Sequence, residues 1–137
     1  MSYAGDITPE EAWKLLVDDP EAVLVDCRTE AEWRFVGVAD LSSLDREAVY
    51  VEWNSSDGKH NDDFVDDLKT AGVTPGDRPV VFLCRSGNRS IGAAQAATAA
   101  GIAPSYNILD GFEGDLDENK HRGRTGWKAV GLPWRQS

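Results

Sequence analysis

The sequence predicts a single α/β domain of three layers, in which a central parallel β-sheet carries helices on both faces. Three observations support this fold class. Short apolar runs alternate along the chain with segments of helical spacing. The runs 22–25 and 79–83 have no polar alternation, which is typical of parallel strands buried on both sides. The chain of 137 residues, 41% of them hydrophobic, has the size and composition of one well-filled core, so we interpret residues 1–137 as one domain.

The first half of the chain predicts two helices and two strands in alternation. Thr8 before Pro9, with acidic residues in the next positions, is typical of a capped helix start. The run after this helix is too short for another helix and is expected to be a buried strand that ends at Asp26, Cys27 and Arg28. In chain order, the predicted elements are a helix from Pro9 to near Asp19, a strand over 22–25, a short helix from Thr29 to Phe35 and a weaker strand over 48–51.

The second half predicts the centre of the sheet and its covering helices. The run 79–83 is the most apolar of the chain, and we expect it to be the central strand. The other predicted elements are an amphipathic helix over 62–71 ended by Gly72, a helix of small residues over 91–100 ended by Gly101, a strand over 105–109, a turn at 110–111, a long polar loop over 113–126, and a short terminal helix with a tail over 126–134.

Composition argues against several classes of protein. With 14 Lys and Arg against 24 Asp and Glu, the formal charge of −10 opposes binding to nucleic acid. The sequence has no apolar stretch long enough for a membrane span and no leader-like start, so we expect a cytoplasmic protein without a membrane partner. The two cysteines, Cys27 and Cys84, are too few for a disulfide framework and are expected to be free thiols.

The segment that follows the central strand carries the most chemical information. It reads Cys84-Arg85-Ser86-Gly87-Asn88-Arg89-Ser90 and leads directly into a helix. Ligands of open α/β sheets bind beyond the carboxyl ends of the strands, where this segment is expected to lie. Successive N–H groups of such a turn and the positive end of the helix would stabilise a thiolate on Cys84.

The sequence resembles the rhodanese (thiosulfate sulfurtransferase) family over nearly its whole length. The resemblance rests on several motifs in the family's order: Val23 to Arg28 with Glu30 to Trp33 behind it, the strand Val80 to Leu83, the loop Cys84 to Arg89, Asp110-Gly111-Phe112, and Gly126-Trp127 to Pro133. It implies a rhodanese-like three-layer fold. It also implies that Cys84 carries a sulfane sulfur as a persulfide.

The residues of the loop suggest how such a reaction would run. A Cys84 thiolate attacks the outer sulfur of a small anionic donor such as thiosulfate, and a thiol or cyanide then accepts the sulfur. A protein is a further candidate acceptor. This chemistry requires no metal and no organic cofactor. The residues expected to bind the substrate are Arg85, Ser86, Gly87, Asn88 and Arg89, and the expected supporting residues are Asp26, Arg28 and Ser90.

Each of these residues also has a structural interpretation. The two loop arginines, Arg85 and Arg89, either contact the anionic donor or are solvated surface charges, and Arg89 has the further alternative of an internal carboxylate partner. Asp26 is expected to accept structural hydrogen bonds rather than to act as a base. Arg28 is expected to pair with Glu30, Glu32 or a similar acid. Cys27 is either a packed thiol or a resolving thiol for Cys84.

The sequence departs from the family pattern in two segments. Residues 37–42 lack the His and Pro that many members have after the first strand–helix unit, which leaves the conformation of this segment open. The stretch 113–126 is longer than a compact member needs and is predicted to be a mobile flap outside the core. Its acidic residues imitate a calcium loop, but Lys120 stands where a Gly is required, so we predict no calcium site.

Two other classes of function share parts of this pattern. A cysteine-dependent phosphatase would need an arginine at position 90, where the chain has Ser90. A non-catalytic regulatory domain of the rhodanese fold would be expected to have lost the cysteine that this chain keeps at position 84. The sequence therefore favours a sulfurtransferase over both.

Overall fold

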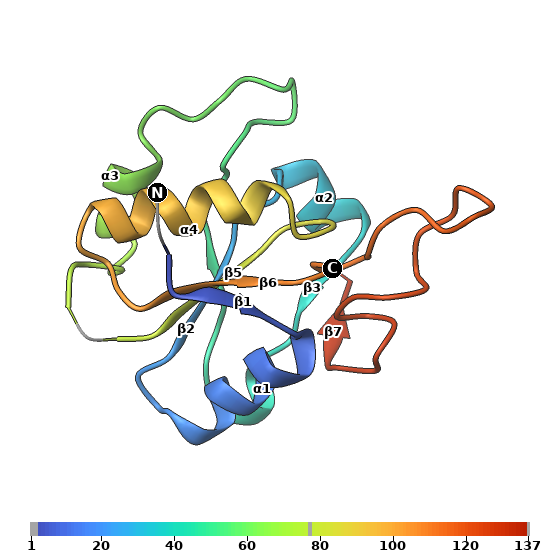
Figure 1. Ribbon diagram of the computed structural model, residues 1–137, viewed down its shortest axis with the longest axis horizontal. Coiled ribbons are helices and arrows are strands. Elements are labelled where there is room, and N and C mark those ends of the chain that lie inside the picture. The colour runs from blue at the N-terminus through green and yellow to red at the C-terminus, as the bar shows by residue number, and fades with distance from the viewer. Residues whose placement is uncertain (1–2, 77, 137) are drawn as a thin grey trace.

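A five-stranded parallel sheet forms the middle layer of the computed structural model, which describes residues 3–76 and 78–136 (Figure 1). Residues 1, 2, 77 and 137 of the predicted domain lie outside the described residues. The strand order is β1-β6-β5-β2-β4, so the predicted central strand lies in the middle of the sheet. The strands are β1 (Gly5–Ile7), β2 (Val23–Asp26), β4 (Val49–Tyr50), β5 (Val80–Leu83) and β6 (Ser105–Ile108).

Helices cover both faces of this sheet, as the sequence predicts (Figure 1). They are α1 (Pro9–Asp18), α2 (Glu30–Phe35), α3 (Phe64–Thr70) and α4 (Arg89–Ala99). The predicted caps are present: Thr8 and Thr29 each form a capping box with the glutamate three residues later. Helix α3 begins at Phe64 and helix α4 at Arg89. Each start lies within two residues of the predicted one.

The alternation of side chains along β2 and β5 divides the core into two clusters. On one face, Val25 and Phe82 pack against buried residues of α3 and α4. On the other face, Leu24 and Val81 pack against α1 and against Trp127 from the C-terminal segment. Every residue of both strands is buried, which explains why neither strand shows polar alternation.

Two short strands differ from the sequence-based expectation. β1 was not predicted, because three residues containing a glycine and an aspartate carry no strand period; the strand is held by its parallel ladder with β6. The predicted terminal helix within 126–134 is wrong. Residues 127–131 form turns, and β7 (Trp134–Arg135) pairs antiparallel with β3 (Val38–Ala39).

The same pairing defines the segment whose conformation the sequence left open. Residues 37–42 contain β3 and lead into a 3-10 helix (Ser42–Leu44). Gly37 has a φ of +113°, and a Cβ atom there would lie 2.8 Å from the carbonyl oxygen of Arg135. Glycine is therefore required just before β3, where the backbone comes close to Arg135 at the end of β7.

The stretch 113–126 contains turns and bends but no helix or strand, and most of its side chains are exposed. It lies outside both core clusters, as predicted. Its start is nevertheless tied to the body of the protein, because the Gly114 N–H bonds Asp110 O at 2.7 Å. The Gly123 N–H bonds Glu113 O at 2.9 Å and so closes the stretch on itself.

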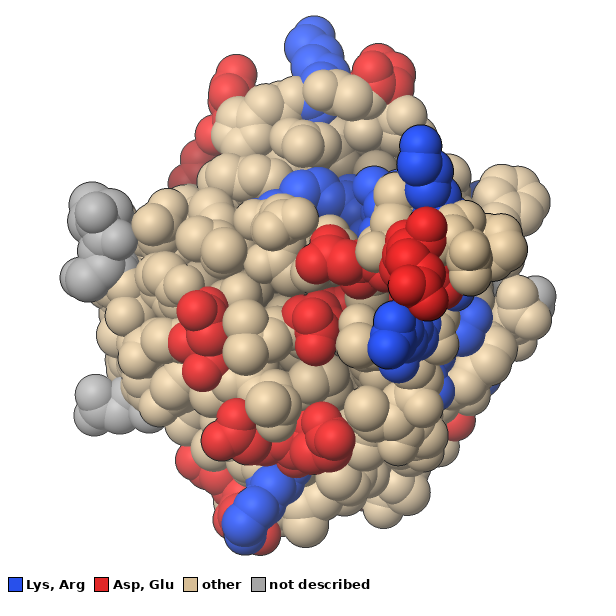
Figure 2. Space-filling view, turned by 45° about the vertical axis from the view of Figure 1, so that its right-hand side comes forward, with Lys and Arg blue, Asp and Glu red and all other residues tan. Residues whose placement is uncertain are grey.

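Charged side chains of both signs are mixed on the face shown in Figure 2, where acidic groups spread from top to bottom. This distribution agrees with the formal charge of −10. Within the described part of the chain, none of the helices is both long and apolar enough to cross a membrane.

Candidate active site

The carboxyl ends of β2 and β5 place the candidate residues at one edge of the sheet. Cys84 is the first residue after β5, and Cys27 and Arg28 follow β2. The Cys84 thiol is buried, with 1% of the residue exposed. The loop 84–88 then leads into the N-terminus of α4, so the strand, the loop and the helix have the predicted order around the sulfur.

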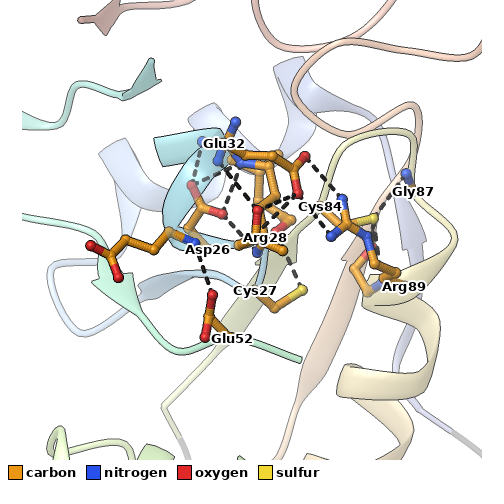
Figure 3. A network of polar contacts seen from close by, with 12 residues as sticks. Asp26, Cys27, Arg28, Glu32, Glu52, Cys84, Gly87 and Arg89 are labelled. Atoms are coloured by element: carbon orange, nitrogen blue, oxygen red, sulfur yellow. Dashed lines mark hydrogen bonds and ion pairs between the residues drawn. The ribbon is translucent and has the colours of Figure 1, made fainter. Parts of the chain in front are cut away.

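Three hydrogen-bonding groups surround the Cys84 sulfur (Figure 3). The backbone N–H of Gly87 donates to Sγ at 3.1 Å, and that of Ser90 donates at 3.4 Å. The Ser90 hydroxyl lies 3.2 Å from Sγ. Two backbone donors aimed at one sulfur favour a negative charge on it. Gly87 has a φ of +93°, and a Cβ atom there would lie 2.9 Å from the backbone nitrogen of Asp110, so the turn requires glycine.

A buried polar chain continues from Ser90 into the sheet. The Ser90 hydroxyl donates to Asn107 Oδ1, and the Asn107 amide donates to Asp6 Oδ1 at 3.0 Å. Ser90 and Asn107 are fully buried. Because the hydroxyl proton is used on Asn107, the Cys84 S–H is the donor to Ser90 Oγ when the thiol is protonated. The sequence did not single out Asn107 or Asp6; the local signal was an Asn inside the predicted strand 105–109.

The segment after β6 holds the carbonyl groups of the loop. The Phe112 N–H bonds Cys84 O at 2.8 Å, and the Glu113 N–H bonds Arg85 O at 2.9 Å. Gly111 has a φ of +56°, and a Cβ atom there would clash with the carbonyl of Cys84. The carbonyls of Cys84 and Arg85 are thus bonded away from the sulfur, to which the N–H groups of Gly87 and Ser90 point.

Arg89 is paired with an internal carboxylate, which is the further alternative that the sequence offers for this residue. Its Nη1 and Nη2 atoms bond Glu32 Oε1 and Oε2 at 2.9 and 3.0 Å (Figure 3). Burial alone raises the pKa of Glu32, but the hydrogen bonds and charge of Arg89 outweigh it and lower this pKa overall. The same contacts raise the pKa of Arg89 against the opposing effect of burial. This pair ties the start of α4 to α2.

The other loop residues predicted to contact the substrate lie nearer the surface. Arg85 and Asn88 are exposed, and Ser86 is half-buried. The Asn88 amide donates to the Ser86 hydroxyl at 3.3 Å. Their contact with a substrate stays a prediction.

Asp26 and Arg28 form a buried ion pair, and this corrects the predicted partner of Arg28. The Arg28 side chain is 0% exposed, and its Nη2 atom lies 2.7 Å from Asp26 Oδ2, so Asp26 and not Glu30 or Glu32 is its ion-pair partner. Asp26 lies only two positions before Arg28 in the sequence. The Arg28 side chain therefore turns back over the end of β2 to reach the Asp26 carboxylate. Nη2 also donates to Gly37 O at 2.7 Å, and the guanidinium lies 4.3 Å from the centre of the Phe112 ring. Asp26 thus accepts structural hydrogen bonds, as expected.

Cys27 is a packed thiol in this structure. It is 0% exposed, and its S–H donates to Leu83 O at 3.3 Å. Burial, followed by the nearby charges of Cys84 and Asp26, raises the pKa of this thiol well above its ordinary value. Cys27 and Cys84 are both free cysteines.

A metal site was not expected, and residues 3–76 and 78–136 contain no cluster of His, Cys, Asp and Glu side chains that could hold a metal ion.

The chain matches one protein family and is similar in sequence to several known proteins. The family described as "STR4 middle domain" matches residues 4–137. An uncharacterised protein RC0915 of Rickettsia conorii is 35% identical over 130 residues, which cover 95% of this chain and 96% of the relative. The chloroplastic protein named THYLAKOID RHODANESE-LIKE of Oryza sativa subsp. indica is 29% identical over 95% of this chain and 25% of its own length.

Solved structures share the architecture. The crystal structure of Rv0390 from M. tuberculosis superposes with a TM-score of 0.93 at 69% identity, over 99% of this chain and 100% of that one. The crystal structure of a rhodanese-like domain protein from Staphylococcus aureus has a TM-score of 0.58 at 21% identity, over 78% of this chain and 86% of that one. The second of these similarities concerns the fold alone.

Proposed function

The chain belongs to the rhodanese-like family, and on this premise we propose that it is a sulfurtransferase that carries a sulfane sulfur on Cys84. The donor is a small anionic sulfur compound such as thiosulfate, and the acceptor is a thiol or cyanide. The observation that carries this proposal is the set of donors around the Cys84 sulfur, namely the N–H groups of Gly87 and Ser90 and the Ser90 hydroxyl.

The first half-reaction loads the sulfur. The Cys84 thiolate attacks the outer sulfur of thiosulfate, a new S–S bond forms, and the S–S bond of the donor breaks. Sulfite leaves with the electron pair of that bond, and a Cys84 persulfide anion remains. The N–H groups of Gly87 and Ser90 favour negative charge at this place, which supports both the attacking thiolate and the persulfide.

The second half-reaction returns the thiolate. Cyanide or a thiolate attacks the outer sulfur, the S–S bond to Cys84 breaks, and its electron pair returns to Cys84 Sγ. The product is thiocyanate or a new persulfide. Ser90 supports the change between the two states, because its hydroxyl can donate to Asn107 when Cys84 is a thiol and turn towards Sγ when Cys84 is an anion.

Arg85 is the positive charge of the loop that remains available to an anionic donor. It is exposed, whereas Arg89 is engaged with Glu32. The pairing of Arg89 also argues against a phosphatase, because such an enzyme needs a free arginine that spans two oxygens of the phosphate.

The test is sulfur transfer by the wild type and by Cys84→Ser. We expect the wild type to form thiocyanate from thiosulfate and cyanide, and Cys84→Ser to form none above background, because serine cannot hold the sulfur. Cys27→Ser is the matched control, since it also removes one buried thiol, and it should keep the activity. Intact-mass analysis of Cys27→Ser after thiosulfate treatment should show one added sulfur.

Two results would contradict the proposal. Equal thiocyanate formation by Cys84→Ser would remove Cys84 from the reaction. A folded wild type that takes up no sulfur and releases no sulfite from thiosulfate, polysulfide or a persulfide donor would favour the non-catalytic regulatory domain instead.

A further inference from the structure

The two cysteines occupy matched positions on neighbouring strands. β2 and β5 pair in parallel with Val25 opposite Phe82 and Asp26 opposite Leu83, so Cys27 and Cys84 are the next pair in register. The ladder continues to this point, because the Cys27 N–H donates to Leu83 O at 2.9 Å. Side chains alternate along a strand, and both cysteines lie in the same core cluster as Val25 and Phe82.

The Cys27 thiol lies against the peptide unit that joins Leu83 to Cys84. Its S–H donates to the carbonyl oxygen of that unit at 3.3 Å, and Figure 3 shows both sulfurs in this part of the site. Neighbouring strands lie about 4.8 Å apart. Disulfide-bonded cysteines have Cα atoms about 4.4–6.8 Å apart, so the register of β2 and β5 brings this pair within the range of a disulfide.

The surroundings protect Cys27 from reagents in solution. The residue is fully buried, and its pKa is raised mainly by burial, so it is a neutral thiol when the site is at rest. The neighbouring Arg89 charge, which lowers the same pKa, supplies a partner for a developing thiolate. A thiol in this position meets a reactive sulfur only if that sulfur is brought to it inside the protein.

We propose that Cys27 discharges the Cys84 persulfide from within, forming a Cys27–Cys84 disulfide and releasing hydrosulfide. Cys27 Sγ attacks Cys84 Sγ, the new disulfide bond forms, and the bond to the outer sulfur breaks. The outer sulfur takes the electron pair of that bond and the proton of Cys27, and it leaves as HS⁻. The two cysteine sulfurs are oxidised and the sulfane sulfur is reduced, so no other oxidant is required.

This inference rests on the proposed function and adds a second fate for the bound sulfur. When an acceptor is present, the outer sulfur is transferred and Cys27 stays a thiol. When no acceptor arrives, the sulfur leaves as hydrosulfide and the site is closed as a disulfide. An external dithiol then reduces the disulfide and restores the thiol pair.

The experiment follows one loading under anaerobic conditions. Reduced wild type and Cys27→Ala, freed of reductant, are incubated with thiosulfate and no acceptor, then alkylated and weighed as intact chains, while hydrosulfide is trapped with a bimane reagent. We expect the wild type to lose two hydrogens in mass, to take up no alkyl group and to release one hydrosulfide per chain. Cys27→Ala should keep the added sulfur and release none.

A second arm tests the thiol pair without sulfur chemistry. Diamide added to the reduced wild type should produce the same intramolecular disulfide, and peptide mapping should find Cys27 joined to Cys84. Cys27→Ser is run beside Cys27→Ala, so that loss of folding in one variant, measured by circular dichroism, does not decide the result.

The outcomes separate this inference from the proposed function. If wild type and Cys27→Ala keep the added sulfur equally and release no hydrosulfide, the internal discharge is wrong and the sulfurtransferase stands. If neither takes up sulfur, the proposed function is wrong and the discharge falls with it, whatever diamide does. If diamide yields no disulfide in the folded wild type, the two thiols do not come into reach and the discharge is wrong.

Discussion

The two arginines of the loop, Arg85 and Arg89, have different surroundings and therefore different expected roles. Arg85 is exposed and Arg89 is bonded to Glu32 through both of its terminal nitrogens. Removing Arg89 would leave the largely buried carboxylate of Glu32 without its charged partner. Removing Arg85 would take away a positive charge without changing the packing.

Arg89→Ala is therefore expected to affect mainly the stability of the fold, and Arg85→Ala mainly the reaction with thiosulfate. Arg89→Ala should lower the free energy of unfolding by about 1–3 kcal/mol, because Glu32 Oε2 loses its hydrogen-bond donor and the carboxylate loses its countercharge, although Thr29 still bonds Oε1. Arg85→Ala should change that free energy by less than about 0.5 kcal/mol. It should instead lower kcat/KM for thiosulfate about tenfold, the cost of one charge-assisted contact. Urea unfolding and steady-state kinetics of both variants distinguish the two roles, and added salt should reproduce part of the Arg85 effect.

Equal effects of the two substitutions on stability would contradict this division. Unchanged thiosulfate kinetics in Arg85→Ala would leave Arg85 as a solvated surface charge.

Glu32 also makes the stability of the fold depend on pH. Its pKa is lowered in the folded protein, so the stabilisation is fully present above the pKa of the unfolded chain, about 4.3, and is lost as the pH falls through the lower folded value. We expect the wild type to be more stable than Glu32→Gln at pH 7, and this difference to shrink below about pH 4.3. Glutamine keeps the helix cap, so it is a suitable control. Urea unfolding from pH 7 to pH 3 measures the difference, and a constant gap would contradict the pairing.

The secondary-structure elements show which features the sequence could predict. The capped helices α1 and α2 and the buried strands β2 and β5 depend on local signals, and the structure confirms them. β1 and β7 depend on partners far along the chain, β6 and β3, and no local period reveals such pairing.

The candidate site follows the same rule. The Cys84 loop could be predicted, because the strand, the loop and the helix are contiguous in sequence. The chain from Ser90 through Asn107 to Asp6 could not, because it joins residues from three separate elements. The partner of Arg28 was also missed, because the local sequence offers several acids and only the turn at the end of β2 selects Asp26.

The stretch 113–126 is expected to exchange its amide hydrogens unevenly. The N–H groups of Gly114 and Gly123 bond the carbonyls of Asp110 and Glu113, whereas the middle is exposed and holds a local turn in which the Asp117 N–H bonds His121 O. We expect fast exchange over residues 115–121 and slower exchange at Gly114, measured by hydrogen–deuterium exchange with peptide resolution. Strong protection of the middle would contradict a mobile flap and indicate an ordered added element.

At the scale of the whole molecule, the formal charge of −10 opposes the approach of any dianion, whether thiosulfate or a phosphate ester. The two anions differ in what they need once they arrive. The N–H groups of Gly87 and Ser90 point to a single sulfur atom, Cys84 Sγ, while a phosphate needs a wider ring of donors and an acid for the leaving alcohol.

We therefore expect the protein to form thiocyanate from thiosulfate and cyanide but to hydrolyse aryl phosphates no faster than Cys84→Ser. Phosphate release is measured by the coloured phenol product under the same conditions as the thiocyanate assay. Phosphate release that depends on Cys84, without persulfide from any donor, would support the phosphatase instead.

The burial of Cys84 has a kinetic consequence. With 1% of the residue exposed, a donor or acceptor meets almost no Cys84 surface while the loop 84–88 keeps the conformation seen here, so we expect the loop to open during turnover. The rate at which an external acceptor removes a bound sulfur then depends on how often the site opens, and not on the concentration of thiols in solution alone. Between openings, a loaded chain is shielded from dissolved oxidants, so its sulfur leaves either to an acceptor that an opening admits or through the internal discharge by Cys27.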